Sequence, residues 1–203
     1  WGLTGNAGTT PGTNFIGTTD MQNLIIKVNN TQVGKITSPS EGNSIYLGLN
    51  TDGTITNAVF IGENAGYSTM SANNSNMIGL NAGYNAWNAS ESNFIGHDAG
   101  KGANGAQYSN FIGREAGLNA SNATYSIFIG DAAGKSASDA TYSLFLGNNT
   151  GLNAFGAGNS NFIGAIAGSG AENAAYSNFF GISAGMDAVN ANNSIFIGNN
   201  AGN

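Results

Sequence analysis

Residues Ser92–Tyr108 read SNFIGHDAGKGANGAQY, and the next segment of equal length, Ser109–Tyr125, reads SNFIGREAGLNASNATY. Counted from the serine as position 1, both segments run to position 17 and share Phe at position 3, Ile at position 4, Gly at positions 5 and 9, and Ala at positions 8, 12 and 15. The period continues through most of the chain, and a fixed period of this kind is typical of a solenoid with one coil per repeat. The glycine at position 5 marks nine copies: Gly62, Gly79, Gly96, Gly113, Gly130, Gly147, Gly164, Gly181 and Gly198.

The Phe-Ile-Gly segment at positions 3 to 5 predicts a short strand. It is bulky, shows no helical period and is bounded by Gly and Asn. Neighbouring strand residues point to opposite faces, so Phe94 and Ile95 both need a buried environment. The interior of the coil can bury one of them, but the small alanines at positions 12 and 15 leave the coil too thin to bury the other.

We therefore expect an all-β chain in which a 17-residue-repeat β-solenoid, or β-roll, forms an intertwined homotrimer around a shared apolar axis. Strands would stack along the fibre axis about 4.8 Å apart, the usual spacing of paired strands. Asparagine side chains at positions 2 and 14 would form hydrogen-bonded ladders along the stack. The alternative is a monomeric solenoid whose second apolar face is a packed sheet.

Three regions are expected along the chain. Residues 1–42 do not follow the period, and we interpret them as an N-terminal β-hairpin cap on the stack. Residues 43–57 are interpreted as a transitional short coil, because the glycines Gly48 and Gly62 lie closer together than the period requires. Residues 58–203 are the 17-residue β-solenoid repeats.

The hairpin in the first region is predicted from two apolar runs separated by a turn signal. Leu24–Val28 reads as the first strand, the Asn-Asn pair that follows it reads as the turn, and Thr31–Ile36 reads as the returning strand.

Composition excludes several classes of function. The chain has 203 residues, no cysteine, a net charge of −6 and only five Lys and Arg residues, which are spread along the sequence. A disulfide framework and a cysteine-based metal site are excluded, and nucleic acid is not an expected partner. No apolar run approaches the length of a membrane span, so we expect no membrane insertion, and no cofactor is implied. The chain begins at Trp1 without a methionine and stops within a repeat, so we interpret it as part of a longer protein.

Large side chains interrupt the repeat pattern in two adjacent coils. Tyr67 and Tyr84 share position 10, and Met70 and Trp87 share position 13. Stacking of the coils would place each pair about 5 Å apart. With the amides of Asn85 and Asn88 beside them, these side chains suit a sugar ring that stacks on an aromatic face. The other interpretation is that they fill a groove between chains or pack under the N-terminal cap.

A second aromatic interruption lies four coils further on. Leu152 and Phe155 occupy the same two positions, and Phe155 would form a separate receptor-binding patch about 19 Å away at the same strand spacing.

Acidic residues form another column at positions 6 and 7. Asp98 and Glu115 share a position in successive coils, and Asp131 follows. Paired carboxylates are the chemistry of glycosidic-bond hydrolysis or of a Ca²⁺ site. The simpler interpretation is a solvated turn that holds a contact between His97 and Glu115, or between Asp98 and Arg114, with little energetic value.

Two parts of the sequence resemble known fibre proteins. The segment WGLTGNAGTTPGTNFIGTTDMQNLIIKVNNTQVGKI, residues 1–36, resembles a segment common in large bacterial surface or prophage proteins. There it precedes Gly-rich repeats and often a C-terminal intramolecular chaperone. The SNFIGxxAG repeats are similar to the head repeats of trimeric autotransporter adhesins, which are shorter, and to shafts and tips of bacteriophage long tail fibres. The resemblance implies a trimeric, extracellular or virion-borne binding protein, and it transfers no site residues.

The function expected from these observations is that of the receptor-binding tip of a temperate phage long tail fibre. It would attach the virion to a host cell-surface glycan or protein, and it would not be an enzyme. A trimeric adhesin on a bacterial cell surface is the alternative. A polysaccharide depolymerase built on the acidic column is less favoured, and so is an ice-binding protein, because threonine is scattered rather than arrayed.

Overall fold

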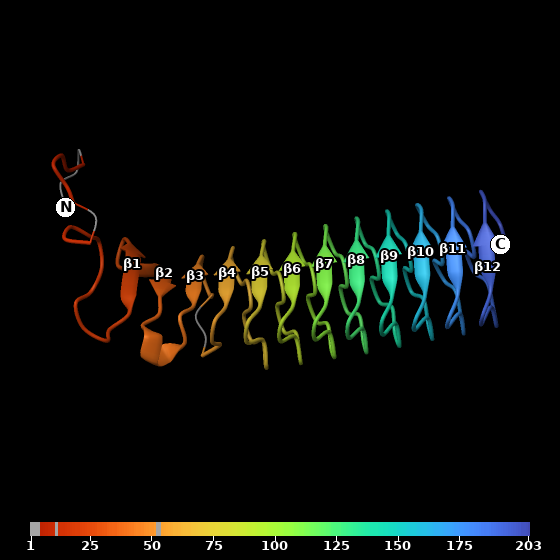
Figure 1. Ribbon diagram of the computed structural model, residues 1–203, viewed down its shortest axis with the longest axis horizontal. Helices are drawn as coiled ribbons and strands as arrows, with labels where there is room; N and C mark the ends of the chain where they lie inside the picture. Colours follow the sequence, from red (N-terminus) through yellow and green to blue (C-terminus); the bar gives the residue numbers. More distant parts are fainter. Residues whose placement is uncertain (1–4, 11, 52–53) are drawn as a thin grey trace.

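The computed structural model describes residues 5–10, 12–51 and 54–203. Residues 1–4 and 11 of the predicted cap region 1–42, and residues 52–53 of the predicted transitional coil 43–57, lie outside the described residues. The chain forms one elongated β-solenoid whose strands stand side by side along its long axis, with β1 near the N-terminus and β12 near the C-terminus (Figure 1).

Among the described residues, a single sheet of twelve strands runs in chain order. The first three strands pair antiparallel, and β3 to β12 pair parallel and in register. The strands and the one 3₁₀ turn are β1 Leu24–Val28, β2 Thr31–Ile36, η1 Pro39–Glu41, β3 Ile45–Leu47, β4 Val59–Ile61, β5 Asn76–Ile78, β6 Asn93–Ile95, β7 Asn110–Ile112, β8 Ile127–Ile129, β9 Leu144–Leu146, β10 Asn161–Ile163, β11 Asn178–Phe180 and β12 Ile195–Ile197.

The predicted period is the period of the structure. Strands β4 to β12 align each residue with its counterpart in the next repeat, such as Phe111 with Phe128. The step from β3 to β4 is shorter than the period, with Tyr46 opposite Phe60. The prediction of an all-β, 17-residue solenoid is therefore confirmed. The predicted hairpin strands are present as β1 and β2, and Asn29 and Asn30 between them both have positive φ, as a tight hairpin turn requires.

A second parallel ladder, the bridge ladder, runs along position 13 from Met70 to Val189. There a single residue bridges to its counterpart in the next coil, as Trp87 does to Asn104 and Ser138 to Phe155. Each coil thus has one three-residue strand and one bridging residue, joined by turns. Both ladders hold the coils in the same register, so residues at equal positions form straight columns.

The phenylalanines at position 3 form the core. Their side chains point into the coil, and from Phe94 to Phe196 successive rings stack with centroids 4.5 to 5.0 Å apart. Alanines at positions 8, 12 and 15 close the interior around them. The residues at position 4 point outward and remain partly exposed, at 36 to 39% for Ile61, Ile95, Ile112, Leu146 and Phe180.

Left-handed backbone explains the abundance of Gly and Asn. In the coil Ser92–Tyr108, positive φ occurs at positions 5, 7, 9, 11, 14 and 17. Only Gly, and to a lesser extent Asn and Asp, adopt this conformation at low cost. Two of the glycines have a further reason: a Cβ on Gly96 would meet the carbonyl group of Gly113 in the next coil, and a Cβ on Gly100 would meet the ring of Phe94.

A buried serine spine joins the coils at position 1. The hydroxyl of Ser126 donates to the carbonyl oxygen of Ala140 at 2.6 Å and accepts the backbone N–H of Ser143 at 3.1 Å. The other buried serines at position 1 make the same pair of bonds. Members of the spine are Ser75, Ser92, Ser109, Ser126, Ser143, Ser160 and Ser177.

Side-chain amides form ladders along the axis. The predicted ladder at position 2 is present, with the amide of Asn76 donating to Asn93 and that of Asn93 to Asn110, both at 2.7 Å. At position 14, Asn122 donates to Asp139 at 2.7 Å. A further ladder, which the sequence did not suggest, runs along position 7 through Asn50, Asn64, Asn81 and Asp98.

Candidate functional site

Four large side chains gather on two adjacent coils, and we call them the aromatic patch: Tyr67, Met70, Tyr84 and Trp87. The rings of Tyr67 and Tyr84 stack with centroids 5.5 Å apart and planes 19° apart. Met70 and Trp87 are bridge partners in the position-13 ladder. The predicted side-by-side placement of both pairs is therefore confirmed.

Two backbone bonds to the next coil fix the position of Trp87. Its N–H donates to the carbonyl oxygen of Ala103 at 2.8 Å, and its carbonyl accepts from the N–H of Gly105 at 3.0 Å. Ala86 and Ala89 of the same coil are buried in the core, whereas the indole is 53% exposed. The local fold thus presents the ring to solvent on a fixed backbone.

A shallow depression lies beside the indole. Its volume is about 330 Å³, and it is lined by Asn85, Trp87, Gly102, Ala103 and Asn104. It exists because the next coil has glycine and asparagine where Trp87 would otherwise meet bulky side chains. An aromatic face bordered by amides can bind a ring that is apolar on its faces and hydroxylated at its edge.

Two amides, those of Asn85 and Asn88, were predicted to lie beside Trp87, and one of them lines the depression. Asn85 lines the depression as expected, whereas Asn88 is exposed but is not among the lining residues, and Asn104 of the next coil takes that place. Asn88 was suggested because it is next to Trp87 in the sequence. Asn104 lies beside Trp87 because the coils stack in register and both residues are at position 13.

Phe155 is also exposed, at 50%, but it stands alone. Its bridge partners at position 13 are Ser138 and Glu172, so no aromatic side chain is adjacent to it in that column. Leu152 is half-buried. Phe155 therefore gives an isolated apolar point rather than a second patch of the same kind.

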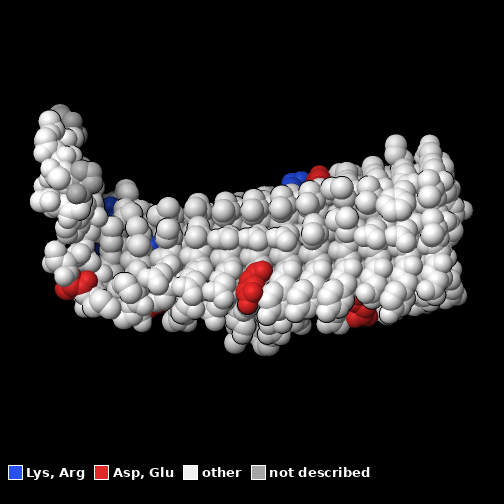
Figure 2. All heavy atoms as spheres, in the orientation of Figure 1, with Lys and Arg blue, Asp and Glu red and all other residues white. Residues whose placement is uncertain are grey.

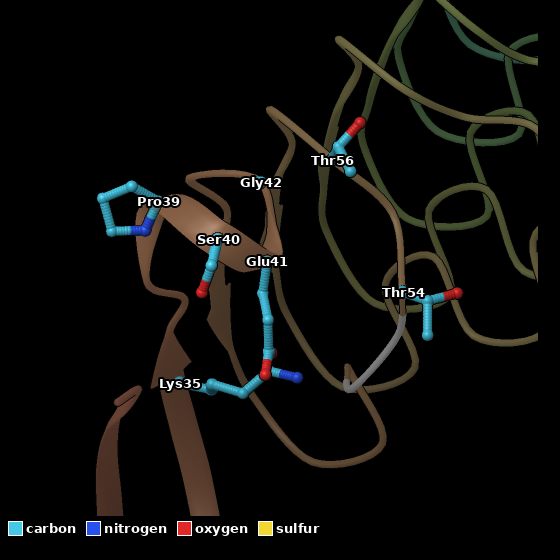
Figure 3. Close-up of a pocket in the computed structure, with 7 residues that line it drawn as sticks. All are labelled: Lys35, Pro39, Ser40, Glu41, Gly42, Thr54 and Thr56. Atoms are coloured by element: carbon cyan, nitrogen blue, oxygen red, sulfur yellow. The ribbon is translucent and has the colours of Figure 1, made fainter. Parts of the chain in front are cut away.

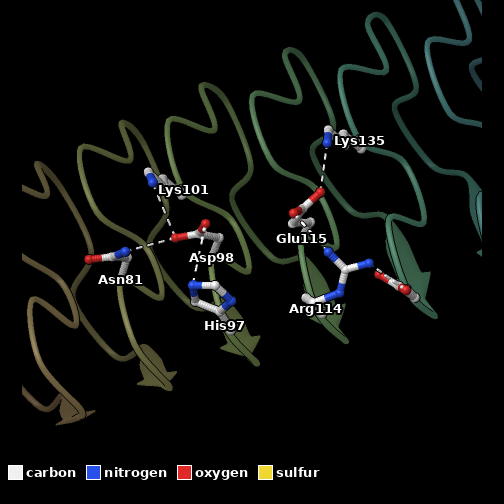
Figure 4. A network of polar contacts seen from close by, with 8 residues as sticks. Asn81, His97, Asp98, Lys101, Arg114, Glu115 and Lys135 are labelled. Atoms are coloured by element: carbon white, nitrogen blue, oxygen red, sulfur yellow. Dashed lines mark hydrogen bonds and ion pairs between the residues drawn. The ribbon is translucent and has the colours of Figure 1, made fainter.

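The acidic column forms a charged row along the turns that follow β6 to β8 (Figure 4). Asp98 contacts Lys101 at 3.2 Å and lies 3.6 Å from the imidazole of His97. One coil later, Glu115 contacts Lys135 at 2.6 Å and Arg114 at 2.9 Å.

The ion pairs named from the sequence are not those that form. His97 lies against Asp98 rather than Glu115, and Arg114 bonds Glu115 and Asp131 rather than Asp98. Equal positions stack on equal positions, so Arg114 at position 6 reaches Asp131, the position-6 residue of the next coil, at 2.7 Å.

Asp98 is held by an amide, an ammonium group and an imidazole. Partial burial on its own would raise its pKa. The hydrogen bonds from Asn81 and Lys101, together with the charges of Lys101 and His97, outweigh burial and leave the pKa below the ordinary value. An ionised carboxylate that is already satisfied by an amide and an ammonium group is poorly suited to act as an acid or to release its oxygens to a ligand.

The row as a whole is a neutralised cluster. Its three acidic residues Asp98, Glu115 and Asp131 all contact Lys or Arg side chains. Within residues 5–10, 12–51 and 54–203, no group of three or more His, Cys, Asp or Glu residues could hold a metal ion. These contacts support the simpler interpretation of the acidic column as a stabilised surface turn.

A pocket lies where the hairpin meets the first coil (Figure 3). Its volume is about 610 Å³ and it is lined by Lys35, Pro39, Ser40, Glu41, Gly42, Thr54 and Thr56. The Lys35 ammonium lies 5.0 Å from the ring centroid of Tyr46, and Glu41 accepts a bond from Asn23 at 2.8 Å. Sequence reasoning missed this pocket because the region has no period that would place its residues together.

Sequence reasoning also missed a row of stacked tyrosines at position 17. The rings of Tyr108, Tyr125 and Tyr142 are nearly parallel, with centroids 4.7 and 4.9 Å apart. Burial between its neighbours raises the pKa of the Tyr125 hydroxyl, and Tyr108, Tyr142 and Glu91 act in the same direction. The signal was present in the sequence, since three successive repeats end in Tyr.

The rest of the surface is mostly uncharged. Only 8% of all residues carry charge, and the face in Figure 2 shows rows of uncharged side chains along the axis with charged residues in a few separate places. No helix among the described residues is long and apolar enough to cross a membrane.

No protein-family model matches the chain, and no curated protein matches it.

Proposed function

We propose that this chain is the receptor-binding part of a fibre, and that the aromatic patch contacts a glycan or protein on a cell surface. The carrier would be a phage long tail fibre, with a bacterial surface adhesin as the alternative. The observation that carries the proposal is the exposed Trp87 beside an amide-lined depression.

Aromatic side chains of this kind are not needed by the scaffold. Position 13 is occupied by Asn104, Ser121, Ser138 and Glu172 in other coils without change of register. Exposed indole and phenol rings are favoured at binding surfaces because one part of the ring is apolar and another can form hydrogen bonds. The patch thus has a property that repeat packing alone does not explain.

The stiff shape of the solenoid suits attachment at a distance. Two parallel ladders and a continuous core join each coil to the next, and few residues are charged. Contacts are made only between neighbouring coils, as in other solenoids, which gives an extended rod with exposed faces.

We further propose that three chains assemble through the outward residues of position 4, with the β1–β2 hairpin covering the first coil. These side chains form an apolar row along the molecule, and rows of this kind mark interaction surfaces. The row comprises Ile61, Ile78, Ile95, Ile112, Ile129, Leu146, Ile163, Phe180 and Ile197.

A glycan array and a host-cell attachment assay on the whole chain test the proposed site. Trp87→Ala should reduce attachment at least tenfold, because the stacking face is lost, while the circular dichroism spectrum and unfolding midpoint stay the same. Phe155→Ala is the matched control, since it removes an equally exposed ring from the same column. Equal attachment by wild type and Trp87→Ala would show that the patch is not the site.

A further inference from the structure

The tyrosines of position 17 lie where the backbone favours other residues. Every described residue at this position has φ between 54° and 59°, and the column holds Asn57, Asn74, Glu91, Tyr108, Tyr125, Tyr142, Asn159, Tyr176 and Asn193. The left-handed conformation suits Asn and disfavours a large aromatic residue. A residue held in a strained conformation points to a role other than the fold.

The exposure of these rings increases along the axis. Tyr108 and Tyr125 are 42% and 47% exposed, whereas Tyr142 and Tyr176 are 59% and 63% exposed. The first three rings cover one another by stacking. The row is then interrupted by Asn159, so Tyr142 and Tyr176 have no ring on the sides that face each other.

The interruption has the width of one ring. The backbone ladder continues through it without a shift, since the N–H of Asn159 bonds the carbonyl of Thr141 at 2.8 Å and that of Tyr176 bonds Gly158 at 2.9 Å. Tyr142 and Tyr176 are therefore two coils apart, about 9 to 10 Å. A ring placed midway would lie at about the spacing that the tyrosines of the row already keep.

The residues around the interruption are small and polar. The Asn159 side chain is exposed, and within the described part of the chain its amide makes no hydrogen bond. Gly158 before it has no side chain, and Ala175 takes the same position one coil later. An amide can donate and accept at once, which is the pairing that a sugar hydroxyl offers.

We propose that Tyr142 and Tyr176 hold a pyranose ring between them, with hydroxyls of the sugar bonded to the amide of Asn159. A ring held between two aromatic faces must be apolar on both sides. Only pyranoses with all ring hydroxyls equatorial, the gluco configuration, expose C–H groups on both faces. An axial hydroxyl, as in mannose or galactose, would place a polar group against one tyrosine and lose its hydrogen bonds to water.

The ligand class rests on the proposed function, but this site is separate from the aromatic patch. Phe155 follows Trp87 by four coils in the bridge ladder, and Asn159 belongs to the same coil as Phe155. The two sites are thus about 19 Å apart along the axis at the strand spacing. A variant at one of them leaves the other unchanged.

Saturation-transfer NMR and calorimetry on the whole chain test the proposal, with β-1,4-linked tetrasaccharides of glucose, mannose and galactose as probes. The glucose probe should bind, and the mannose and galactose probes should bind at least tenfold more weakly. No binding of the glucose probe, or equal binding of all three, would overturn the proposal.

The central variant is Asn159→Tyr, which completes the row of rings. Position 17 already accepts tyrosine in four coils, so the fold should persist and binding of the glucose probe should fall at least tenfold. Asn193→Tyr is the matched control, because it adds a ring on the far side of Tyr176 and leaves the interruption open. Unchanged binding by Asn159→Tyr would refute the site.

Trp87→Ala separates this proposal from the proposed function. This variant should lose cell attachment and should still bind the glucose probe. If it instead loses the probe while Asn159→Tyr keeps it, the sugar binds at the aromatic patch and the site at Asn159 is wrong. If the probe never binds but Trp87 is needed for cell attachment, only the inference about Asn159 fails.

Discussion

The side-chain amide of Asn81 donates a hydrogen bond of 2.9 Å to Oδ1 of Asp98, its counterpart one coil later. The same direction holds along the ladder, from Asn50 to Asn64 and from Asn64 to Asn81. An ionised carboxylate can only accept hydrogen bonds, so Asp98 is suited to the end of the ladder and not to its middle. Asp139 ends the bond from Asn122 in the same way.

Loss of the Asp98 charge should weaken the solenoid at low pH. Its pKa in the folded chain lies below the ordinary value of 3.8. The resulting stabilisation is complete above that value and is lost as the pH falls through it toward the lower pKa of the folded state. Asp98→Asn should therefore be less stable than wild type at neutral pH, and the difference in urea midpoint should shrink in acid. A difference independent of pH would contradict this assignment.

The serine spine should be sensitive to loss of a single hydroxyl. Ser126→Ala removes the partner of a buried carbonyl at Ala140 and of a buried N–H at Ser143. We expect a loss of about 1 to 3 kcal/mol in the free energy of unfolding, the cost of unpaired buried polar groups. Ser138→Ala, at a half-buried position of the bridge ladder, should change stability by less than about 0.5 kcal/mol. If both variants lost the same free energy of unfolding in urea, the serine spine would not contribute more to stability than the bridge ladder.

Tyrosine at position 17 should lower the free energy of unfolding unless its ring stacks on neighbouring rings. Tyr176 has no stacking partner in its column, so Tyr176→Asn relieves the left-handed strain and should raise stability by about 1 kcal/mol. Tyr125→Asn relieves the same strain but loses stacking on both faces, and each aromatic pair contributes about 0.5 to 1.5 kcal/mol. It should therefore be neutral or destabilising. Thermal unfolding of both variants checks the expected order, which would be wrong if Tyr125→Asn were the more stable.

The proposed trimer can be tested by measuring the mass of the protein in solution. Light scattering on the purified chain should give three times 20.5 kDa. Ile112→Asp places a charge in the middle of the position-4 row and should shift the mass toward the single chain, because an unpaired charge would be buried between chains. Lys135→Asp changes charge away from that row and should keep the trimer. A wild-type mass of one chain would refute the assembly.

The repeat was readable from the sequence because each column has a separate physical requirement. Phe94 must fill the core, Gly100 must leave space for its ring, and Ser92 must join two coils, so a change in any of them is penalised in every coil. The solenoid fold and the pairing of Met70 with Trp87 followed from the period. Partners off the column did not, because the period alone does not show that Lys135 at position 10 reaches Glu115 at position 7 one coil earlier.

The row of tyrosines escaped prediction for a different reason. These tyrosines stand out only because their φ angles are positive, a conformation in which tyrosine is rare. The sequence does not show that backbone conformation. The pocket beside Lys35 escaped because the region before the repeats has no counterpart elsewhere in the chain.

The constant register of the coils gives this protein a built-in unit of length. Removing or adding one whole repeat from β4 onward leaves every column intact, while a deletion shorter than a repeat breaks all of them. The rod can thus change length only in steps of one coil, about 4.8 Å each. The distance between Trp87 and Asn159 is set by the same steps, so inserting whole coils between them would move the two proposed sites apart without changing the residues of either one.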